Sequence, residues 1–333
     1  MRARALVLAG VAGLLSLTVA TPAEASGVPE LWATGQPFAP GLTVMGAGDV
    51  NGDGKGDVVT YDNGECWVSL STGSGFQPMQ LWCDPYWSSV PAGDASFVGD
   101  ANNDGRADLI LVDKDVVGNT HRSGVWVATS YFDARQLRDR FAPSRQWLDN
   151  TIFGDQGNLA VDLEGDGDTD VIGLFTGVPA LAARASHPSY LPLTAWGPDN
   201  LRGEKATLAA DATGDGLADF ILVDADGTRV VPATVDTRWH VTPPQQWSTT
   251  PFYGTEKTFT GDVDADGKAD LIAVNDTDVQ VMRSTGAGYA APEVWYAGSF
   301  SGTKDTVTSD VDGDGDTDLV AVNDSDIRVL RSQ

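Results

Sequence analysis

An aspartate-rich segment of nine residues recurs six times along this chain of 333 residues. Its most regular copy runs from Asp310 to Asp318, with oxygen-bearing side chains at positions 1, 3, 5 and 9 and a glycine at position 6. A hard cation such as Ca²⁺ takes about six to eight oxygen ligands. Glycine permits the sharp turn that aims alternate side chains at one point, because it adopts positive φ without a Cβ clash. The segment therefore predicts a loop that binds Ca²⁺.

The other five copies keep aspartate at positions 1, 5 and 9 and glycine at position 6. Position 3 varies. Glu164 is one methylene longer than aspartate and Thr213 carries no charge, so the third and fourth loops are expected to bind metal most weakly. The candidate side-chain ligands, loop by loop, are Asp49, Asn51, Asp53 and Asp57; Asp100, Asn102, Asp104 and Asp108; Asp162, Glu164, Asp166 and Asp170; Asp211, Thr213, Asp215 and Asp219; Asp262, Asp264, Asp266 and Asp270; and Asp310, Asp312, Asp314 and Asp318.

The residues after each loop decide between two kinds of calcium loop. An EF-hand needs a glutamate at position 12 and a helix on either side. Position 12 is never glutamate here, as Thr60 and Ala273 illustrate. Each loop is followed instead by a short apolar run, such as Leu271 to Val274, which predicts a buried strand. Each loop is thus expected to join two strands.

Successive loops start 48 to 62 residues apart, a period typical of propellers and solenoids. The strands expected in the fifth repeat are Phe259-Thr260, Leu271 to Val274, Val279 to Arg283 and Glu293 to Trp295. Four such antiparallel strands make one propeller blade. One tryptophan precedes each loop in constant phase and is expected to pack between blades: Trp32, Trp82, Trp147, Trp196, Trp247 and Trp295.

The two ends of the chain predict how the ring closes. The last repeat stops after its third strand, Ile327 to Leu330, and an unmatched strand around Leu31-Trp32 precedes the first loop. The N-terminal strand is therefore expected to complete the last blade, which leaves no open sheet edge. The predicted fold is an all-β, six-bladed β-propeller of four-stranded antiparallel blades over residues 26–333.

With these loops and blades, the chain resembles the FG-GAP and VCBS repeats, the calcium-bearing blades of integrin α-subunit propellers and of many secreted bacterial proteins. The resemblance covers essentially all of residues 27–333. A Phe-Gly pair occurs in phase only at Phe153-Gly154, so the bacterial VCBS type is the closer one. The resemblance implies up to six Ca²⁺ ions that hold the turns in shape. It also implies a further ligand, the position-7 carbonyl, which falls on Lys55, Arg106, Asp168, Leu217, Lys268 and Asp316.

Residues 1–25 have the features of a secretory signal peptide. Arg2 and Arg4 precede an apolar stretch that ends near Ala20, and a small-x-small cleavage site follows. The stretch is shorter than the roughly 20 apolar residues that span a bilayer. The sequence therefore predicts a secreted protein with no membrane span, in which Cys66 and Cys83 are expected to form a disulfide across a hairpin.

The formal net charge of −26 argues against a nucleic-acid partner, which needs a basic surface. About half of the acidic residues belong to the six loops, because the loops hold 23 of the 47. About half of the negative charge thus belongs to the predicted metal sites.

Three tryptophans outside the regular phase are candidates for binding a ligand. Trp67 and Trp126 align with Gln280 and Arg328 on third strands, so they are expected to face solvent and to offer flat rings to a sugar. Trp87 is the third. The second repeat also carries an insertion with a basic patch, including His121, Arg135 and Arg138, which suits an acidic glycan or a partner protein.

Two other functional classes stay open. A polysaccharide lyase or glycosidase needs a defined His, Tyr, Arg or carboxylate cluster. The three histidines lie in different repeats, and no catalytic residue is assigned. A scaffold or adhesion subunit of a secreted complex would share the same fold. The favoured expectation is a lectin-like module that binds an extracellular glycan or a cell-surface protein, with its oligomeric state left open.

Overall fold

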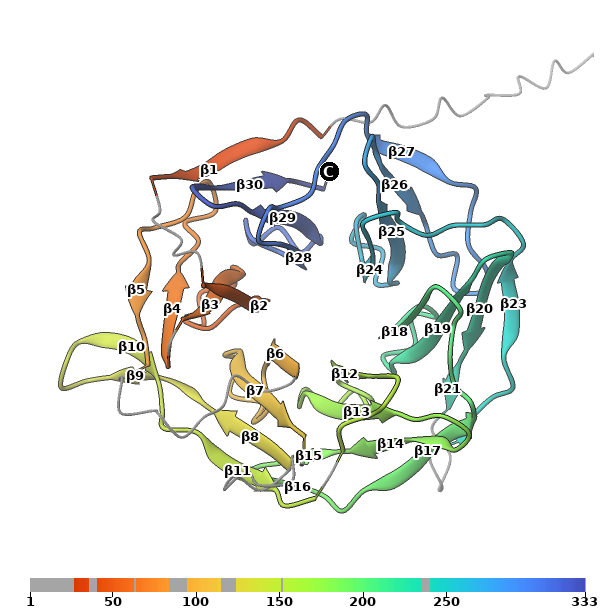
Figure 1. Ribbon diagram of the computed structural model, residues 1–333, viewed down its shortest axis with the longest axis horizontal. Coiled ribbons are helices and arrows are strands. Elements are labelled where there is room, and N and C mark those ends of the chain that lie inside the picture. The colour runs from red at the N-terminus through yellow and green to blue at the C-terminus, as the bar shows by residue number, and fades with distance from the viewer. Residues whose placement is uncertain are drawn as a thin grey trace, which may run out of the picture.

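The computed structural model describes residues 27–35, 41–62, 64–83, 95–114, 124–150, 152–234 and 240–332. Six four-stranded antiparallel sheets stand as blades around a common axis (Figure 1). The described residues form strands and turns and no helix. The prediction of an all-β, six-bladed propeller is confirmed.

In blades 1 to 3, each blade runs from an inner to an outer strand. Their strands are β2 (Thr43–Gly48), β3 (Asp57–Asp62), β4 (Glu65–Ser69) and β5 (Gln80–Leu81); β6 (Ala95–Gly99), β7 (Asp108–Asp113), β8 (Gly124–Ala128) and β11 (Arg145–Leu148); and β12 (Gly157–Val161), β13 (Asp170–Leu174), β14 (Pro179–Ala183) and β17 (Thr194–Asp199).

Blades 4 to 6 repeat this order. Their strands are β18 (Ala206–Ala210), β19 (Asp219–Asp224), β20 (Gly227–Val231) and β23 (Gln245–Ser248); β24 (Lys257–Gly261), β25 (Asp270–Val274), β26 (Val279–Met282) and β27 (Glu293–Tyr296); and β28 (Asp305–Ser309), β29 (Asp318–Val322), β30 (Asp326–Leu330) and β1 (Glu30–Thr34). Small hairpins follow three of the third strands: β9 (Ser130–Asp133) with β10 (Arg138–Phe141), β15 (Ala185–Ser186) with β16 (Ser189–Tyr190), and β21 (Ala233–Thr234) with β22 (His240–Val241).

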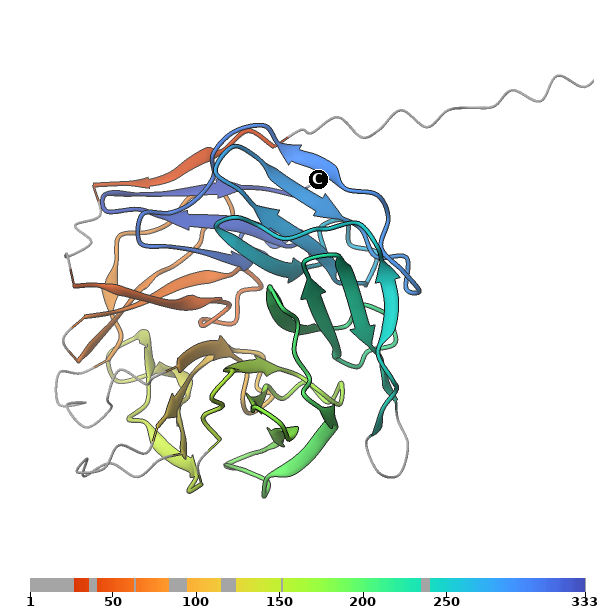
Figure 2. The same cartoon turned by 45° about the vertical axis from the view of Figure 1, so that its right-hand side comes forward.

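The N-terminal strand β1 closes the ring, as predicted. It pairs antiparallel with β30, from Glu30 opposite Val329 to Thr34 opposite Asp326, and both views show β1 and β30 side by side (Figures 1 and 2). The Glu30 carboxylate accepts hydrogen bonds from Arg331 at 2.6 Å and from the Trp32 indole at 3.2 Å. The first described strand and the last described residues are therefore held together by backbone and side-chain contacts.

Six hydrophobic clusters lie between neighbouring blades, and each contains one of the regularly spaced tryptophans. The cluster around Trp32, for example, joins Val58 of blade 1 to Val320 and Val329 of blade 6. The expected packing of these tryptophans between blades is confirmed.

A bulge in the outer strand orients several of these rings. The pairing of β11 with β8 skips Trp147, because Gln146 lies opposite Trp126 and Leu148 lies opposite Val125. Similar register shifts occur at Trp32, Trp247 and Trp295. A bulge re-aims a side chain that regular alternation would place on the other face.

The next blade covers four of these tryptophans with an aromatic ring that follows its third strand. The paired rings, with their centroid separations, are Trp32 and Phe76 at 5.5 Å, Trp82 and Phe141 at 5.3 Å, Trp147 and Tyr190 at 5.9 Å, and Trp247 and Tyr289 at 5.4 Å. Tilted pairs at this separation add to the hydrophobic gain from burial.

Cys66 and Cys83 form a disulfide with a Cα–Cα distance of 4.8 Å, and both are buried in the cluster between blades 1 and 2. The described part of the chain contains no helix of the length and apolar character that crossing a bilayer requires.

The closing strand offers a matched test of this packing. Trp32 is 5% exposed, whereas its neighbour Leu31 is 57% exposed. Trp32→Ala should lower the free energy of unfolding by about 3–5 kcal/mol, because it removes a large buried ring. Leu31→Ala should change it by about 0.5 kcal/mol or less. Urea denaturation measures both, and equal losses would show that the ring is not closed by Trp32.

Candidate functional site

The backbone of each acidic loop folds around its first aspartate. In the first loop, Asp49 accepts hydrogen bonds from the amides of Gly52 at 2.7 Å, Asp53 at 3.1 Å and Gly54 at 2.7 Å. The bond from the position-6 amide recurs in all six loops at 2.7–2.9 Å. All six position-6 glycines have positive φ, between 81° and 97°. Glycine therefore makes the turn as predicted, and the turn sets the side chains at positions 1, 3 and 5.

The position-9 aspartate ties each loop to the third strand of its blade. Asp57 is fully buried and accepts one amide hydrogen bond from Val50 in the loop, at 3.2 Å, and one from Ser71 after β4, at 2.8 Å. The equivalent residues make the same two kinds of bond: Asp108, Asp170, Asp219, Asp270 and Asp318.

Burial disfavours the ionised form of these position-9 carboxylates. Loss of solvation raises the pKa of Asp57 to about 8 and that of Asp219 to about 6, although amide hydrogen bonds oppose the shift. A divalent cation in the loop would favour the ionised form. The electrostatics of the loops therefore fit a cation.

The oxygens at position 3 also fit a metal. Asn102 Oδ1, Glu164 Oε2 and Asp264 Oδ1 are buried and have no hydrogen-bond partner. A buried oxygen without a partner costs free energy, which coordination to a metal would offset. Two loops bring three carboxylates within 4.8 Å of one another and can hold a metal ion: Asp262, Asp264 and Asp270 in the fifth, and Asp310, Asp312 and Asp314 in the sixth. Oxygen donors alone favour Ca²⁺ over a metal that prefers nitrogen or sulfur.

An arginine that the sequence reasoning missed accompanies each acidic residue at position 3. Arg184 contacts Glu164 at 3.0 Å. The equivalent arginines after the third strands of blades 5 and 6 are Arg283, which contacts Asp264 at 2.5 Å, and Arg331, which contacts Asp312 at 3.2 Å. Where position 3 is Asn or Thr, the place of the arginine is taken by an uncharged residue: Leu70, Thr129 or Pro232. This covariation between repeats, at a separation of 19 or 20 residues, is readable in the sequence.

Neighbouring loops are joined by main-chain hydrogen bonds. The amide at position 8 of one loop donates to the carbonyl at position 1 of the loop before it. The described bonds run from Ala107 to Asp49, Thr169 to Asp100, Ala269 to Asp211, Thr317 to Asp262 and Gly56 to Asp310, at 2.6–2.7 Å. The loops thus form a band that passes from blade to blade.

The out-of-phase tryptophans that the structure describes are less exposed than expected. Trp67 on β4 is half-buried, with Leu81 of the outer strand opposite it. Trp126 is also half-buried, packs against the cluster between blades 1 and 2, and has a buried indole N–H without an acceptor. In both cases the opposite residue of the outer strand, Leu81 or Gln146, lies beside the ring on the same face of the sheet. Trp87 and His121 lie outside the described residues.

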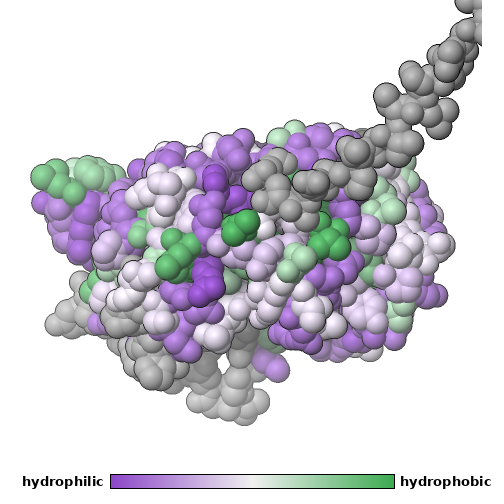
Figure 3. All heavy atoms as spheres, turned by 90° about the horizontal axis from the view of Figure 1, so that it is seen from above, coloured by the Kyte–Doolittle hydropathy of each residue, from purple (hydrophilic) through white to green (hydrophobic). Residues whose placement is uncertain are grey.

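The insertion of blade 2 forms the hairpin β9–β10, whose turn carries Arg135 and whose second strand begins at Arg138. Arg138 donates to Gln136 at 3.0 Å. Asp133 and Asp139 in the same hairpin pair with arginines, so it is less basic than the sequence suggests. The hairpin exposes apolar side chains instead: Tyr131 by 39%, Phe132 by 51% and Leu137 by 78%. The coloured surface seen in Figure 3 is largely hydrophilic, with small separate hydrophobic patches.

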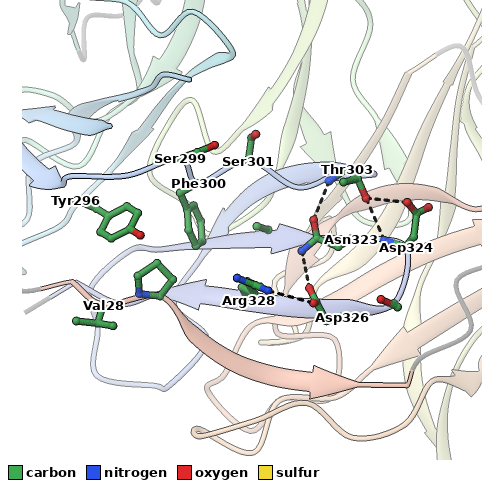
Figure 4. A pocket seen from close by; sticks show the side chains of 13 residues that line it. Val28, Tyr296, Ser299, Phe300, Ser301, Thr303, Asn323, Asp324, Asp326 and Arg328 are labelled. Carbon is green, nitrogen blue, oxygen red and sulfur yellow. Dashed lines mark hydrogen bonds and ion pairs between the residues drawn. The ribbon is translucent and has the colours of Figure 1, made fainter. Parts of the chain in front are cut away.

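A pocket of about 510 Å³ lies between blades 5 and 6 (Figure 4). Its walls come from three separate parts of the chain: Val28 and Pro29 before β1, residues from Tyr296 to Thr303 between β27 and β28, and residues from Ala321 to Arg328 around the turn between β29 and β30. Because these parts are distant in sequence, no local motif marks the pocket.

Hydrogen bonds fix the polar wall of this pocket. Asn323 accepts from the Thr303 amide at 3.0 Å and donates to Asp326 at 2.6 Å, and Thr303 Oγ1 donates to Asp324 at 3.2 Å (Figure 4). Arg328 lies 3.5 Å from Asp326. The side chains of Asp324 and Arg328 remain 71% and 55% exposed, so both can contact a ligand.

The opposite end of the pocket is aromatic. Figure 4 shows Tyr296 beside Val28, across the pocket from Asn323 and Asp324. A Cβ at Gly298 would lie 2.6 Å from the Tyr296 ring, so glycine is needed for this ring position. A ring at one end and fixed polar groups at the other suit a ligand that has both apolar and hydroxyl surfaces.

The fold and these loops define a six-bladed β-propeller with acidic loops between its inner strands. Residues 49–111 and 262–321 match the FG-GAP-like repeat family. The resemblance inferred from the loops is thereby confirmed. No curated protein matches the chain.

Solved structures share the fold at low sequence identity. A lectin from Agrocybe aegerita, described as recognising non-reducing terminal N-acetylglucosamine, is 20% identical with a TM-score of 0.59, over 85% of this chain and 75% of the lectin. The Tc holotoxin pore of Photorhabdus luminescens is 16% identical with a TM-score of 0.59, over 91% of this chain and 14% of that one. A glucose dehydrogenase is 8% identical with a TM-score of 0.50, over 92% of this chain and 99% of the enzyme. These likenesses establish the fold alone.

The position-6 glycine gives a direct test of the loop geometry. Gly267 has a φ of +81°, and no atom lies within 4 Å of the place that a Cβ would occupy, so Gly267→Ala adds backbone strain without a clash. It should lower the free energy of unfolding by about 1–2 kcal/mol. The control Gly288→Ala, where φ is not positive and the nearest atom is at 3.4 Å, should change it by about 0.5 kcal/mol or less. Urea denaturation compares the two, and equal effects would contradict this account of the turn.

Proposed function

We propose that this protein is a calcium-stabilised recognition module that binds a saccharide in the pocket between blades 5 and 6. The observation that carries the proposal is the pocket itself, with an aromatic ring facing polar groups that are already fixed by hydrogen bonds. Its volume of about 510 Å³ lies within the roughly 300–1,000 Å³ of small-molecule sites. The likeness to a lectin propeller supports this choice.

Each group in the pocket has a distinct part in the proposal. The Tyr296 ring packs against the apolar face of a sugar ring. The Asp324 carboxylate accepts hydrogen bonds from sugar hydroxyls, and the Arg328 guanidinium donates to ring or hydroxyl oxygens. Asp326 forms an ion pair with Arg328 and so holds it in place. The partner is then an extracellular or cell-surface glycan.

Contact with a partner protein is the second candidate. The exposed apolar side chains of Phe132 and Leu137 on the β9–β10 hairpin favour it, because such groups are costly in water. A propeller is also part of the larger Tc toxin assembly. In this alternative the chain is a scaffold or adhesion subunit and the hairpin is its contact surface.

We further propose that the acidic loops bind Ca²⁺, up to six ions in all. Side-chain oxygens at positions 1, 3, 5 and 9 and the carbonyl at position 7 would hold each ion, and the position-9 carboxylate is the buried member of this set. The ion would supply positive charge that offsets the crowded carboxylates of the loop. Extracellular loops of this type bind with dissociation constants of roughly 10⁻⁴–10⁻³ M.

An exported protein fits this chemistry. Extracellular fluid is rich in Ca²⁺ at about 1 mM, which would fill sites of this affinity. An oxidising compartment would preserve the disulfide between Cys66 and Cys83. We therefore propose that residues 1–25 act as a signal peptide and that the propeller is secreted.

Saccharide binding can be tested on a glycan array with the protein in Ca²⁺. Tyr296→Ala should reduce retention of the bound glycan about tenfold, since an aromatic contact contributes about 0.5–1.5 kcal/mol beyond its buried area. Tyr131→Ala, on the β9–β10 hairpin and also partly exposed, is the control and should leave retention unchanged.

The same experiment separates the alternatives. Retention that survives Tyr296→Ala would refute the pocket. A protein partner lost with Tyr131→Ala but kept with Tyr296→Ala would favour the hairpin. A reducing-sugar assay on the retained glycan tests for an enzyme, and release of product would overturn the assignment as a binding module.

The calcium proposal predicts a loss of stability on chelation. At about 1 mM Ca²⁺, each filled site adds roughly 0.4–1.4 kcal/mol by mass action, so six sites add roughly 2–8 kcal/mol. EDTA should therefore lower the melting temperature measured by circular dichroism, and EDTA already saturated with Ca²⁺ is the control. A melting curve that EDTA does not shift would refute a structural role for the metal.

A further inference from the structure

We propose that the carboxylates of Asp316 and Asp168 serve the metal loop of the preceding blade, so that two of the six sites are completed across blade junctions and bind Ca²⁺ most tightly. This inference rests on the proposed binding of Ca²⁺ by the loops. It assigns the side chains of these two residues to the neighbouring site, in addition to the carbonyls expected to serve their own loops.

Asp316 is placed beside the fifth loop by the main chain. The adjacent amide, of Thr317, donates to the carbonyl of Asp262, the first residue of the fifth loop, at 2.6 Å. The Thr317 side chain also packs against Gly261, where a Cβ would lie 2.4 Å from it. Position 7 of the sixth loop is thus fixed at the edge of the fifth.

The Asp316 carboxylate is buried without a full set of partners. The residue is 9% exposed, and its Oδ1 atom has no hydrogen-bond partner. The charges that act on it include carboxylates of its own loop and, across the junction, those of Asp262 and Asp264 in the fifth loop. A carboxylate oxygen held among other carboxylates needs a cation to offset the repulsion.

Asp168 repeats this arrangement at the junction of blades 2 and 3. The amide of Thr169 donates to the carbonyl of Asp100 in the second loop at 2.6 Å. Asp168 Oδ1 is buried and has no hydrogen-bond partner, and the Asp100 carboxylate across the junction is among the charges that act on it.

The other four junctions show where a position-7 side chain goes. It lies against position 4 of the preceding loop, where a Cβ would meet it: Gly52 against Arg106 at 3.2 Å, Gly165 against Leu217 at 3.8 Å, Gly214 against Lys268 at 2.9 Å and Gly313 against Lys55 at 3.2 Å. In these junctions position 4 is always glycine, which makes room for the longer side chain.

Position 4 is not glycine at the two junctions that carry aspartate. Asn103 and Ala265 occupy it, with φ of +53° and +51°, a conformation that side chains rarely adopt. The short aspartate leaves space for a side chain there. Residues at positions 4 and 7 of adjacent loops therefore vary together, and the two junctions form a separate class.

Charge separates the two classes further. Three of the other junctions have a cation at position 7: Lys55 and Lys268 pair with the position-5 carboxylates of their own loops, Asp53 and Asp266, and Arg106 pairs with Asp139. A positive group beside a site weakens its attraction for Ca²⁺, whereas an added carboxylate strengthens it. The second and fifth sites each gain a carboxylate across a junction, and at the fifth site the Asp316 carboxylate offsets the Lys268 ammonium that pairs with Asp266. On this ground these two sites are expected to bind the ion first.

Calcium titration of the full chain by isothermal calorimetry, after removal of metal, tests the inference. The unaltered protein should show two sites that bind at least tenfold more tightly than the others. Asp316→Asn and Asp168→Asn should each remove one tight site, and the double variant should retain only the weaker class. Asp226→Asn, the same charge change on an exposed turn of blade 4, is the control and should leave both tight sites.

A second variant tests the inference by adding a carboxylate instead of removing a native one. Leu217→Asp places a carboxylate beside the third loop and should create a third tight site. A single class of equal sites, or tight sites that persist in the double variant, would overturn the inference while leaving calcium binding intact. No binding of Ca²⁺ by the unaltered protein would instead refute the proposed function on which it rests.

Discussion

The position-9 carboxylate is the contact on which each blade depends. It is the first residue of the second strand, and it accepts one amide from the loop before it and one from the end of the third strand. A buried carboxylate is costly unless its oxygens are paired and its charge is offset. The two amides meet the first need. The acidic residues clustered in front of it, with a cation, would meet the second, which explains why a stabilising loop concentrates so much like charge.

Two different seams then hold the blades to one another. The outer seam is hydrophobic, with a tryptophan from a bulged strand packed under the next blade. The inner seam is polar, since the amide of one loop bonds the carbonyl of the loop before it. The hydrophobic and the polar contacts both occur where β1 closes the ring. Trp32 packs in the outer seam, and Glu30 is bonded to Arg331, which also contacts Asp312 in the sixth loop.

Local and repeated features could be predicted from the sequence. The loops, the blades and the closing strand could be predicted from the spacing of the recurring residues in the six repeats, because the same pattern recurs in each of them. The partial burial of Trp67 and Trp126 could not be predicted in this way, since it depends on neighbours outside the repeat pattern, such as the cluster against which Trp126 packs. The pocket could not be predicted either, because Val28, Tyr296 and Asp324 come together only when the ring closes. The arginines that pair with position 3 could have been predicted by comparing the repeats with one another.

The order of strands separates the metal loops from the pocket. In an antiparallel blade, the loop between the first and second strands lies at one end, and the turn between the second and third lies at the other. The sixth metal loop precedes β29, whereas Asn323 and Asp324 follow it. A Ca²⁺ ion in the sixth loop would therefore be too distant to coordinate a saccharide in the pocket, and it would act on the pocket only by keeping blades 5 and 6 folded together. Affinity for the ligand should follow the folded fraction as Ca²⁺ is withdrawn, which distinguishes this design from a lectin whose metal contacts the sugar.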